Sequence, residues 1–267
     1  MMRPDRIVTL AWTQRELLRE LVKREIADRY RGTVFGVAWS FSQPIFMLTV
    51  YTVAIGMLLG VKWPGVDSHE ELALALYAGL LLFNLFAECM GRAGDLVAAQ
   101  PNYVKKVAFP LPLLAWTPVI AAAVQMLVGL VVWSIFYVWV RGMPHWTVVF
   151  VPAIMIPVML MSLGLVWIVG AIGVYARDIG HASNLAVQAM LFLSPIFYDA
   201  RMLPQNIQDL LRLNPLGFLV SSAREAMMEG RVPDLPMLAA FAAGTWLFAM
   251  LGLALFERLQ DGFADAL

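Results

Sequence analysis

The side chains that most often carry out catalysis are few in this sequence and do not form recognisable sites. The three histidines, His69, His145 and His181, fall in expected loops or at the ends of apolar runs, and Cys89 is the only cysteine. Neither H-E-x-x-H nor G-x-S-x-G occurs. One thiol cannot form a disulfide framework or a cysteine-based metal site within one chain. The sequence therefore predicts no metal centre and no hydrolase, and favours structural or interfacial roles for the histidines.

A nucleotide site of the P-loop kind is not expected either. That site needs a glycine-rich turn followed by lysine, and no lysine follows a glycine anywhere in the chain. We expect no cofactor in this chain and no ATP hydrolysis by it.

The composition is typical of a membrane protein. Of 267 residues, 61% are hydrophobic and 14% charged, and the mean hydropathy is +0.73, whereas soluble domains carry about 25% charged residues. The 19 Lys and Arg balance the 19 Asp and Glu, so no positive field exists to hold nucleic acid. These numbers exclude a soluble fold and nucleic-acid binding.

Six uncharged runs predict an all-α integral membrane protein with six transmembrane helices, because a span needs about 20 apolar residues. The runs are 32–61, 72–87, 107–140, 142–176, 179–198 and 235–256. The second run is short, and Glu88 and Arg92, an i,i+4 pair, are expected to extend it at the membrane boundary. The runs are longer than strands and show no alternation, which disfavours a barrel.

The charge distribution predicts the orientation. An even number of spans places both termini on one side, and most of the Lys and Arg excess on that side lies before residue 32. The positive-inside rule then makes both termini cytoplasmic. No cleavable signal peptide is visible in the charged N-terminal segment.

Residues 12–31 read as an amphipathic interface helix. Leu18, Val22, Ile26 and Tyr30 follow one another at i+4 steps, while the pairs Glu20/Arg24 and Glu25/Arg29 lie on the opposite face. A solvated cytoplasmic helix is the alternative.

Two polar connections are long enough for structure of their own. In 91–103, a short helix is expected over 94–100, ended by Pro101, although an ordinary charged hinge fits as well. In 199–230, Leu203, Ile207, Leu210 and Leu211 share one helix face, and Asn214–Pro215 separates it from a second short helix. We expect both helices to be half-submerged at the extracytoplasmic face and packed on the bundle. A passive surface cap is the alternative.

Aromatic residues fall into two groups. Trp63, Trp133, Trp139, Trp146 and Tyr198 lie near expected span ends, where an interfacial belt explains them. Trp39, Phe46, Tyr51 and Phe83 lie deeper and, with Tyr198, are candidates for a ring-lined path for sugars. For any one of these residues, lipid contact or helix packing is the favoured explanation.

The central part of every expected span lacks ionisable residues. Ion-coupled carriers typically use such residues as relays, so the sequence disfavours a proton- or sodium-driven carrier. If the chain transports a substrate, the energy should come from another subunit.

Four stretches together resemble the membrane subunit of ABC polysaccharide exporters, the permeases for O-antigen, capsule or teichoic-acid chains. They are REIADRYRGTVFGVAW at 24–39, NYVKKVAFPLPLL at 102–114, VYARDIGH at 174–181, and LSPIFYDARMLP with LNPLGFLVSSAREAMMEG at 193–230. Their order covers nearly the whole chain and agrees with six spans. Gln43–Pro44 departs from the commoner Asn–Pro of the family but keeps a polar residue before the proline.

The resemblance implies a homodimer in the bacterial inner membrane, with two copies of a separate nucleotide-binding subunit that hold the ATP and Mg. It implies export of undecaprenyl-diphosphate-linked polysaccharide, most simply O-antigen, through a dimeric channel, with membrane lipids as further partners. By resemblance, residues 91–103 contact the ATPase as a coupling helix, and residues 199–230 form a periplasmic gate. The implied coupling residues are Arg92, Asp95, Gln100, Arg29, Tyr30, Arg31, Arg177 and Asp178, although Arg177 and Asp178 are equally explained as an ion pair between spans. The implied gate residues are Leu203, Ile207, Leu210, Leu211, Asn214 and Pro215.

Other functions stay open at this level. Capsule, teichoic-acid or small-molecule export fits the same resemblance. A membrane glycosyl- or phosphatidyl-transferase needs acidic clusters that are not evident, and an ATP-independent flippase needs the missing ionisable residues.

Overall fold

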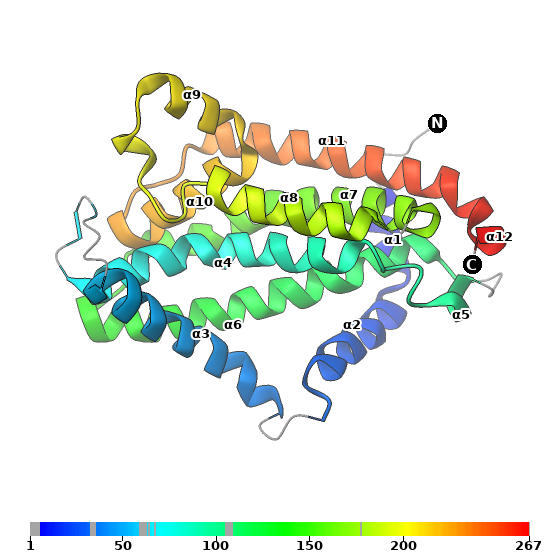
Figure 1. The fold of residues 1–267 in the computed structure, drawn as a ribbon, viewed down its shortest axis with the longest axis horizontal. Helices are drawn as coiled ribbons and strands as arrows, with labels where there is room; N and C mark the ends of the chain where they lie inside the picture. The colour runs from blue at the N-terminus through cyan, green and yellow to red at the C-terminus, as the bar shows by residue number, and fades with distance from the viewer. Residues whose placement is uncertain are drawn as a thin grey trace.

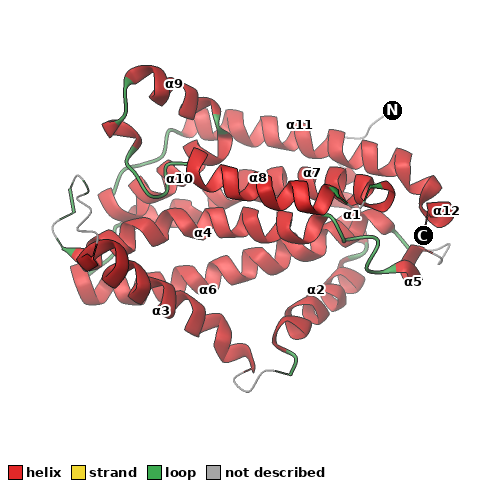
Figure 2. Cartoon of the chain, in the orientation of Figure 1, coloured by secondary structure: helices red, strands yellow, loops and turns green. Residues whose placement is uncertain are grey.

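The computed structural model describes residues 6–32, 36–58, 63, 65–66, 68–104, 109–176 and 178–266. Helices make up most of these residues, and there is no strand among them (Figure 2). The long helices run side by side along the longest axis of the molecule (Figure 1). The predicted all-α class is therefore confirmed for the described part of the chain.

Five helical segments are long and apolar enough to cross a membrane. They match the first, second, third, fourth and sixth predicted spans. In chain order they are α3 (Trp39–Val50) with the π-helical turns η2 (Tyr51–Leu58); α4 (His69–Ala93); η3 (Leu111–Ala115) with α6 (Trp116–Arg141); η4 (Trp146–Phe150) with α7 (Val151–Tyr175); and α11 (Leu235–Leu259) with η7 (Gln260–Gly262) and α12 (Phe263–Ala266).

The fifth predicted span, 179–198, is the one that differs. Its helix α8 covers Ile179–Leu193, 15 residues, or about 22 Å at 1.5 Å per residue. The hydrocarbon core is about 30 Å thick. The helix stops at Ser194, whose neighbour Pro195 has no N–H to continue it. Five of the six predicted spans thus have a helix that is long and apolar enough to cross a membrane, and α8 alone is too short.

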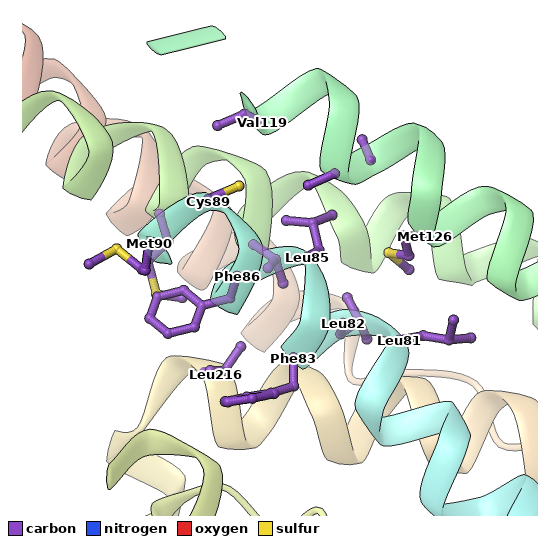
Figure 3. Close-up of a cluster of buried hydrophobic side chains, with 14 of the residues drawn as sticks. Leu81, Leu82, Phe83, Leu85, Phe86, Cys89, Met90, Val119, Met126 and Leu216 are labelled. Atoms are coloured by element: carbon purple, nitrogen blue, oxygen red, sulfur yellow. The ribbon is translucent and has the colours of Figure 1, made fainter. Parts of the chain in front are cut away.

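Helix α4 is the centre of the bundle. It contacts α6, α7, α8 and α10 (Pro215–Arg224), and most of its apolar stretch is buried. Figure 3 shows its side chains in this core, with Phe83 beside Leu216 of α10. The buried Trp133 of α6 donates its indole N–H to the carbonyl of Leu74 at 3.0 Å, so Trp133 packs in the core instead of lying in an interfacial belt.

Glycines let two of the long helices approach closely. Helices α7 and α11 make the most extensive contact in the molecule, and they cross where Gly164 faces Gly252. A Cβ on Gly252 would overlap the backbone of Gly164. Membrane helices use small residues in this way because van der Waals contact replaces the hydrophobic driving force.

The predicted interface helix is present and has an extra helix before it. Helix α1 (Arg6–Thr13) precedes α2 (Arg15–Tyr30). The apolar stripe of α2 is buried through Leu18, Leu21 and Val22 against Leu113 at the start of the third span. The stripe therefore packs on protein, which accounts for its apolar character without lipid.

The chain turns between α2 and α3 at two glycines of the R-Y-R-G-T-x-x-G stretch. Gly32 and Gly36 have φ values of +79° and +51°. Residues with a Cβ rarely adopt these values. The motif glycines are explained by this reversal of the chain.

Residues 91–103 differ from the expected short helix. Arg92 lies in the last turn of α4, residues 94–99 form hydrogen-bonded turns, and Pro101 begins helix α5 (Pro101–Val104) instead of ending one. Proline suits a first helical position because its missing N–H has no partner there. Lys105 and Lys106 lie outside the described residues.

The 199–230 segment contains the two expected short helices, α9 (Gln205–Leu213) and α10, preceded by the turn η5 (Ala200–Met202) and followed by η6 (Glu225–Glu229). Asn214 separates them: its Oδ1 accepts the N–H of Leu216 at 3.1 Å, and Pro215 is the first residue of α10. The packing on the bundle that was expected of these helices is seen for α10. Leu216, Leu219 and Val220 are fully buried, because its apolar face packs on α4 and α7.

The two ends of the bundle differ in what they hold. Helices α1, α5 and α12 lie at one end, here called the terminal end, and α9 and α10 lie at the other, the far end (Figure 1). Arg6 and Glu257 form an ion pair of 2.9 Å at the terminal end. The described residues nearest to the two chain ends therefore lie at one end of the bundle, and the side of the membrane that they face stays a prediction.

Candidate functional site

Two crossed ion pairs join α2 to the end of α4. Arg29 of α2 pairs with Glu88, and Glu25 of α2 pairs with Arg92. We call these four residues the charge clamp. The sequence predicted pairing within each helix, Glu25 with Arg29 and Glu88 with Arg92, and that prediction is wrong. Each helix carries one acidic and one basic side chain on the face that meets the other helix. Because these pairs are partly buried, solvent screens them less than it screens exposed pairs.

The turn after α4 is also tied to α2. In α5, Tyr103 stacks on Phe109 with ring centroids 4.3 Å apart, and Arg24 of α2 donates to its hydroxyl at 3.5 Å. Asp95 is exposed and Gln100 is half-buried on the same connection. The predicted coupling segment therefore contacts the predicted interface helix at the clamp and at Tyr103.

A second connection lies against this segment. The backbone of Gly94 packs on Gly173 at the end of α7 and on Gly180 at the start of α8, so closely that a Cβ would not fit. Asp178 precedes α8 and is exposed. Arg177 lies outside the described residues. The structure thus brings the 94–95 turn beside the α7–α8 turn.

The remaining predicted coupling residues are at the end of α2. Arg31 is exposed and lies 3.7 Å from Asp28. The side chain of Tyr30 is outside the described part of the structure.

A polar cavity of about 380 Å³ opens beside the clamp, between α3, α4 and α6. Its lining includes Gln43, Asn84 and Gln125, together with Arg29 and Glu88 of the clamp. The amide of Gln125 donates to the carbonyl of Ser40 at 3.2 Å, which ties α6 to α3. The sequence signal for this cavity is a single amide in each of three apolar runs.

The far end is organised by a buried arginine that sequence reasoning missed. Arg224 donates to the carbonyls of Ala75 at 3.0 Å, Pro195 at 2.7 Å and Ile196 at 2.8 Å. Its guanidinium also lies 4.7 Å from the ring centre of Trp63, which is buried. We call Arg224 and these four partners the arginine hub. The hub joins α10 to α4, to the turn that ends α8, and to the connection after the first span. The signal was one charged residue on the apolar face of an otherwise apolar stretch.

Burial lowers the pKa of Arg224 to about 10, and the carboxylates of Asp199 and Glu225 oppose that shift. The side chain is therefore charged at neutral pH. A buried guanidinium costs solvation energy unless its N–H groups are bonded, and three carbonyls meet this requirement.

A carboxylate network surrounds the hub. Arg201 bonds Asp199 at 2.7 Å and Glu229 at 2.8 Å, and Arg231 pairs with Glu229 at 3.2 Å. Burial raises the pKa of Asp199, but the bonds from Arg201 outweigh it and hold that pKa below its usual value. The same bonds raise the pKa of Arg201.

Arg141 makes a comparable link nearby. It bonds both carboxylate oxygens of Glu71 at 2.7 and 2.8 Å, and it donates to the carbonyls of Met228 and Gly65 at 3.2 Å. The ends of α4, α6 and η6 are thereby held together.

The predicted channel aromatics do not form one cluster within a single copy of the protein. Trp39 and Phe46 lie on the outer face of α3 and are 44% and 63% exposed. Tyr51 is half-buried against the core, and Tyr198 is half-buried with its hydroxyl bonded to the carbonyl of Phe192. Phe83 is buried in the core (Figure 3), a packing position.

The predicted gate residues are placed on α9 and its ends. Ile207 is exposed, whereas Leu203 and Leu211 are half-buried. The side chain of Leu210 is outside the described part. Asn214 and Pro215 form the break between α9 and α10, as expected, and Asn214 Nδ2 donates to the carbonyl of Leu193 at 3.2 Å.

Within the described residues there is no group of three His, Cys, Asp or Glu side chains arranged to hold a metal. The features that stand out are hydrogen bonds and ion pairs that join helices at each end of the bundle, and the cavity lined in part by Gln43, Asn84 and Gln125. Such an arrangement can transmit movement between helices and can bind polar groups.

Comparison with known proteins agrees with this architecture. A family model described as "ABC-2 type transporter" matches residues 16–228, most of the chain. The chain is 26% identical over 268 residues to the Myxococcus xanthus protein named "O-antigen export system permease protein RfbA", covering 98% of this chain and 99% of that protein. It is 25% identical over 254 residues to a Klebsiella pneumoniae protein of the same name, covering 94% and 95%.

A third relative is named for a different polymer. The chain is 22% identical over 258 residues to the Escherichia coli "Polysialic acid transport protein KpsM", covering 93% of this chain and 95% of that protein. The family match spans the charge clamp, the α7–α8 turn and the arginine hub. With five apolar helices long enough to span a membrane, the chain is a multi-pass membrane permease that belongs to the ABC-2 type transporter family.

Proposed function

We propose that this permease exports undecaprenyl-diphosphate-linked O-antigen polysaccharide across the bacterial inner membrane, driven by ATP. The observation that carries the proposal is similarity to O-antigen export permeases over nearly the full length of both chains. The terminal end faces the cytoplasm and the far end faces the periplasm in this proposal.

The proposed motor is a separate nucleotide-binding subunit in two copies, which carries the ATP and Mg. Residues 91–103, the end of α2 and the turn at Arg177 and Asp178 form the surface for it. Asp95 and Asp178 are exposed there, and the clamp and Tyr103 connect this surface to α2. Movement of the ATPase would then shift α2 against α4 as a rigid element.

The permease is proposed to act as a homodimer. Two of the exposed helix faces suit this role: that of α3, with Trp39 and Phe46, and that of α8, where His181, Asn184 and Gln188 are exposed at i, i+3 and i+7. A polar stripe is costly against lipid tails. A second copy or an aqueous path between two copies accommodates that stripe, and rings on α3 supply apolar faces for sugars.

The test is reconstitution with the proposed ATPase subunit. We expect a stable complex whose vanadate-sensitive ATP hydrolysis rises when lipid-linked O-antigen is added, and no hydrolysis by the isolated permease. Hydrolysis by the pure chain, or a complex that ignores the polymer, contradicts the proposal.

Capsule export is the second candidate, and the relative named for polysialic acid transport favours it. The same complex assayed with lipid-linked polysialic acid separates the two. Stronger stimulation by polysialic acid than by O-antigen assigns the chain to capsule export.

A further inference from the structure

A hollow of about 190 Å³ lies at the far end, between α9, α10 and the turn that follows α8. Its floor is formed by the arginine hub, since Trp63, Pro195 and Arg224 all line it. Leu211 and Phe218 give it an apolar side. The hollow is distinct from the polar cavity at the terminal end.

Two polar side chains facing the hollow have no protein partner in the described part of the chain. Ser221 and Glu225 are four residues apart and lie on one face of α10 and η6, and neither side chain makes a hydrogen bond or ion pair to a described residue. Gln208 of α9 also lines the hollow. Its Nε2 donates to the carbonyl of Leu203 at 2.7 Å. Its amide oxygen accepts no hydrogen bond from a described residue. A hydroxyl, a carboxylate and an amide are therefore available to a ligand.

The charges around the hollow select the chemistry of that ligand. The lining holds the carboxylates of Asp199, Glu225 and Glu229 and the guanidiniums of Arg201 and Arg224, so it carries one more negative than positive charge. Arg201 pairs with Asp199 and Glu229, and backbone carbonyls accept the N–H groups of Arg224. Glu225 is left as the lining carboxylate that accepts no hydrogen bond from a described residue. An anionic ligand is repelled, whereas a neutral ligand with several hydroxyl donors is favoured.

A pyranose ring meets these requirements. Its hydroxyls donate to carboxylate and amide oxygens, and its C–H face packs on an aromatic ring such as that of Phe218. We propose that this hollow binds one neutral pyranose unit of the exported polymer as it leaves the permease. The inference rests on the proposed function and adds to it a contact point and a preference for uncharged sugars.

The direct test is ligand binding by the full-length chain in nanodiscs of phosphatidylethanolamine and phosphatidylglycerol. Detergents with sugar headgroups must be absent, because they would occupy the hollow. The probes are the methyl glycosides of glucose, galactose, mannose and rhamnose, with glucuronate as the matched anion, and the readout is saturation-transfer NMR. We expect binding of at least one neutral glycoside and weaker binding of glucuronate.

Variants locate the binding. Glu225→Gln removes the charged acceptor and Ser221→Ala removes the hydroxyl, and we expect affinity for the glycoside to fall about tenfold in Glu225→Gln, the usual effect of losing a bond to a charged group. Glu70→Gln, an acidic residue outside the lining, is the matched control and should bind like the native chain. Thermal unfolding of each variant shows that the fold is kept.

The outcomes separate this inference from the proposed function. Equal binding by the native chain and Glu225→Gln, preference for glucuronate, or no binding of any neutral glycoside overturns the subsite. If lipid-linked polymer still stimulates the ATPase complex in that case, the exporter proposal stands. If polymer has no effect on the native complex, the exporter proposal fails whatever the glycosides do.

Discussion

The ion pair of Arg92 with Glu25 alters the role expected of Arg92. Arg92 belongs to the predicted coupling segment, yet its charge is taken up by a carboxylate of α2. The same holds for Arg29 and Glu88. The clamp residues therefore hold α2 against the end of α4.

A charge exchange tests that role. Arg92→Glu places two carboxylates together, and we expect a loss of about 1 kcal/mol in stability, the scale of a half-exposed pair, together with weaker recovery of the ATPase subunit. The double variant Glu25→Arg/Arg92→Glu restores the pair and should restore both properties. The measurements are thermal unfolding and co-purification yield. Recovered stability without recovered ATPase binding means that Arg92 contacts the ATPase directly.

Glu225 gives a pH-dependent prediction. Burial, with the charge of Glu229 second, raises the pKa of Glu225 above its ordinary value. The folded state then holds the proton more tightly than the unfolded state, so this group's contribution to stability declines as pH rises above about 4.5. Glu225→Gln lacks that decline. We expect the variant to unfold at a higher temperature than the native chain at pH 7, with the gap closing toward pH 4.5. A constant gap across this range contradicts the assignment.

Among the elements, α7 and α11 depend most on the absence of side chains. Their crossing at Gly164 and Gly252 leaves no room for a Cβ, so any larger residue must push the helices apart. Overpacking of this kind costs about 1–3 kcal/mol.

Paired glycine substitutions on α11 test the crossing. Gly252→Ala should lower the unfolding temperature clearly. Gly244→Ala is the control on the same helix, because Gly244 has open space around it and alanine is the better helix former. If the two variants unfold alike, the close contact between α7 and α11 does not hold in the membrane.

At the scale of the whole molecule, the proposed homodimer predicts which helix face lies between the two chains. In a background with Cys89→Ala, a cysteine at Asn184 or Gln188 on the exposed face of α8 should cross-link two chains on oxidation. A cysteine at Trp139, which is 75% exposed on α6, is the control and should stay monomeric. The readout is the band of doubled mass on a non-reducing gel. Cross-linking through position 139 alone would place the dimer on a different face.

Much of the fold was accessible from the sequence. Apolar runs predicted five of the long helices, and the i+4 stripe of α2 and the Asn214–Pro215 break predicted local structure that is present. The predictions fail where proline is involved, because proline can either begin a helix or end one. Pro101 is expected to end a helix and begins one. The run at 179–198 is uncharged throughout, although Pro195 follows the end of the helix at Leu193.

The candidate sites were less accessible. The stretch around Arg224 was noticed for its resemblance, but nothing in its spacing indicates the carbonyls of Ala75, Pro195 and Ile196. The opposite charges of the clamp were all noted, and their partners were misassigned. Spacing reports which residues share a helix face and does not report which face of another helix they meet.

By itself, the sequence determined that the chain is a helical membrane protein without the usual catalytic motifs, because composition and periodicity act locally and sum along the chain. The tertiary structure alone decided that α10 is buried, that the clamp joins α2 to α4, and that Arg224 holds three segments together. These features depend on contacts between residues far apart in the chain. Such contacts form only where packing brings charged groups out of water and requires each of them to find a partner.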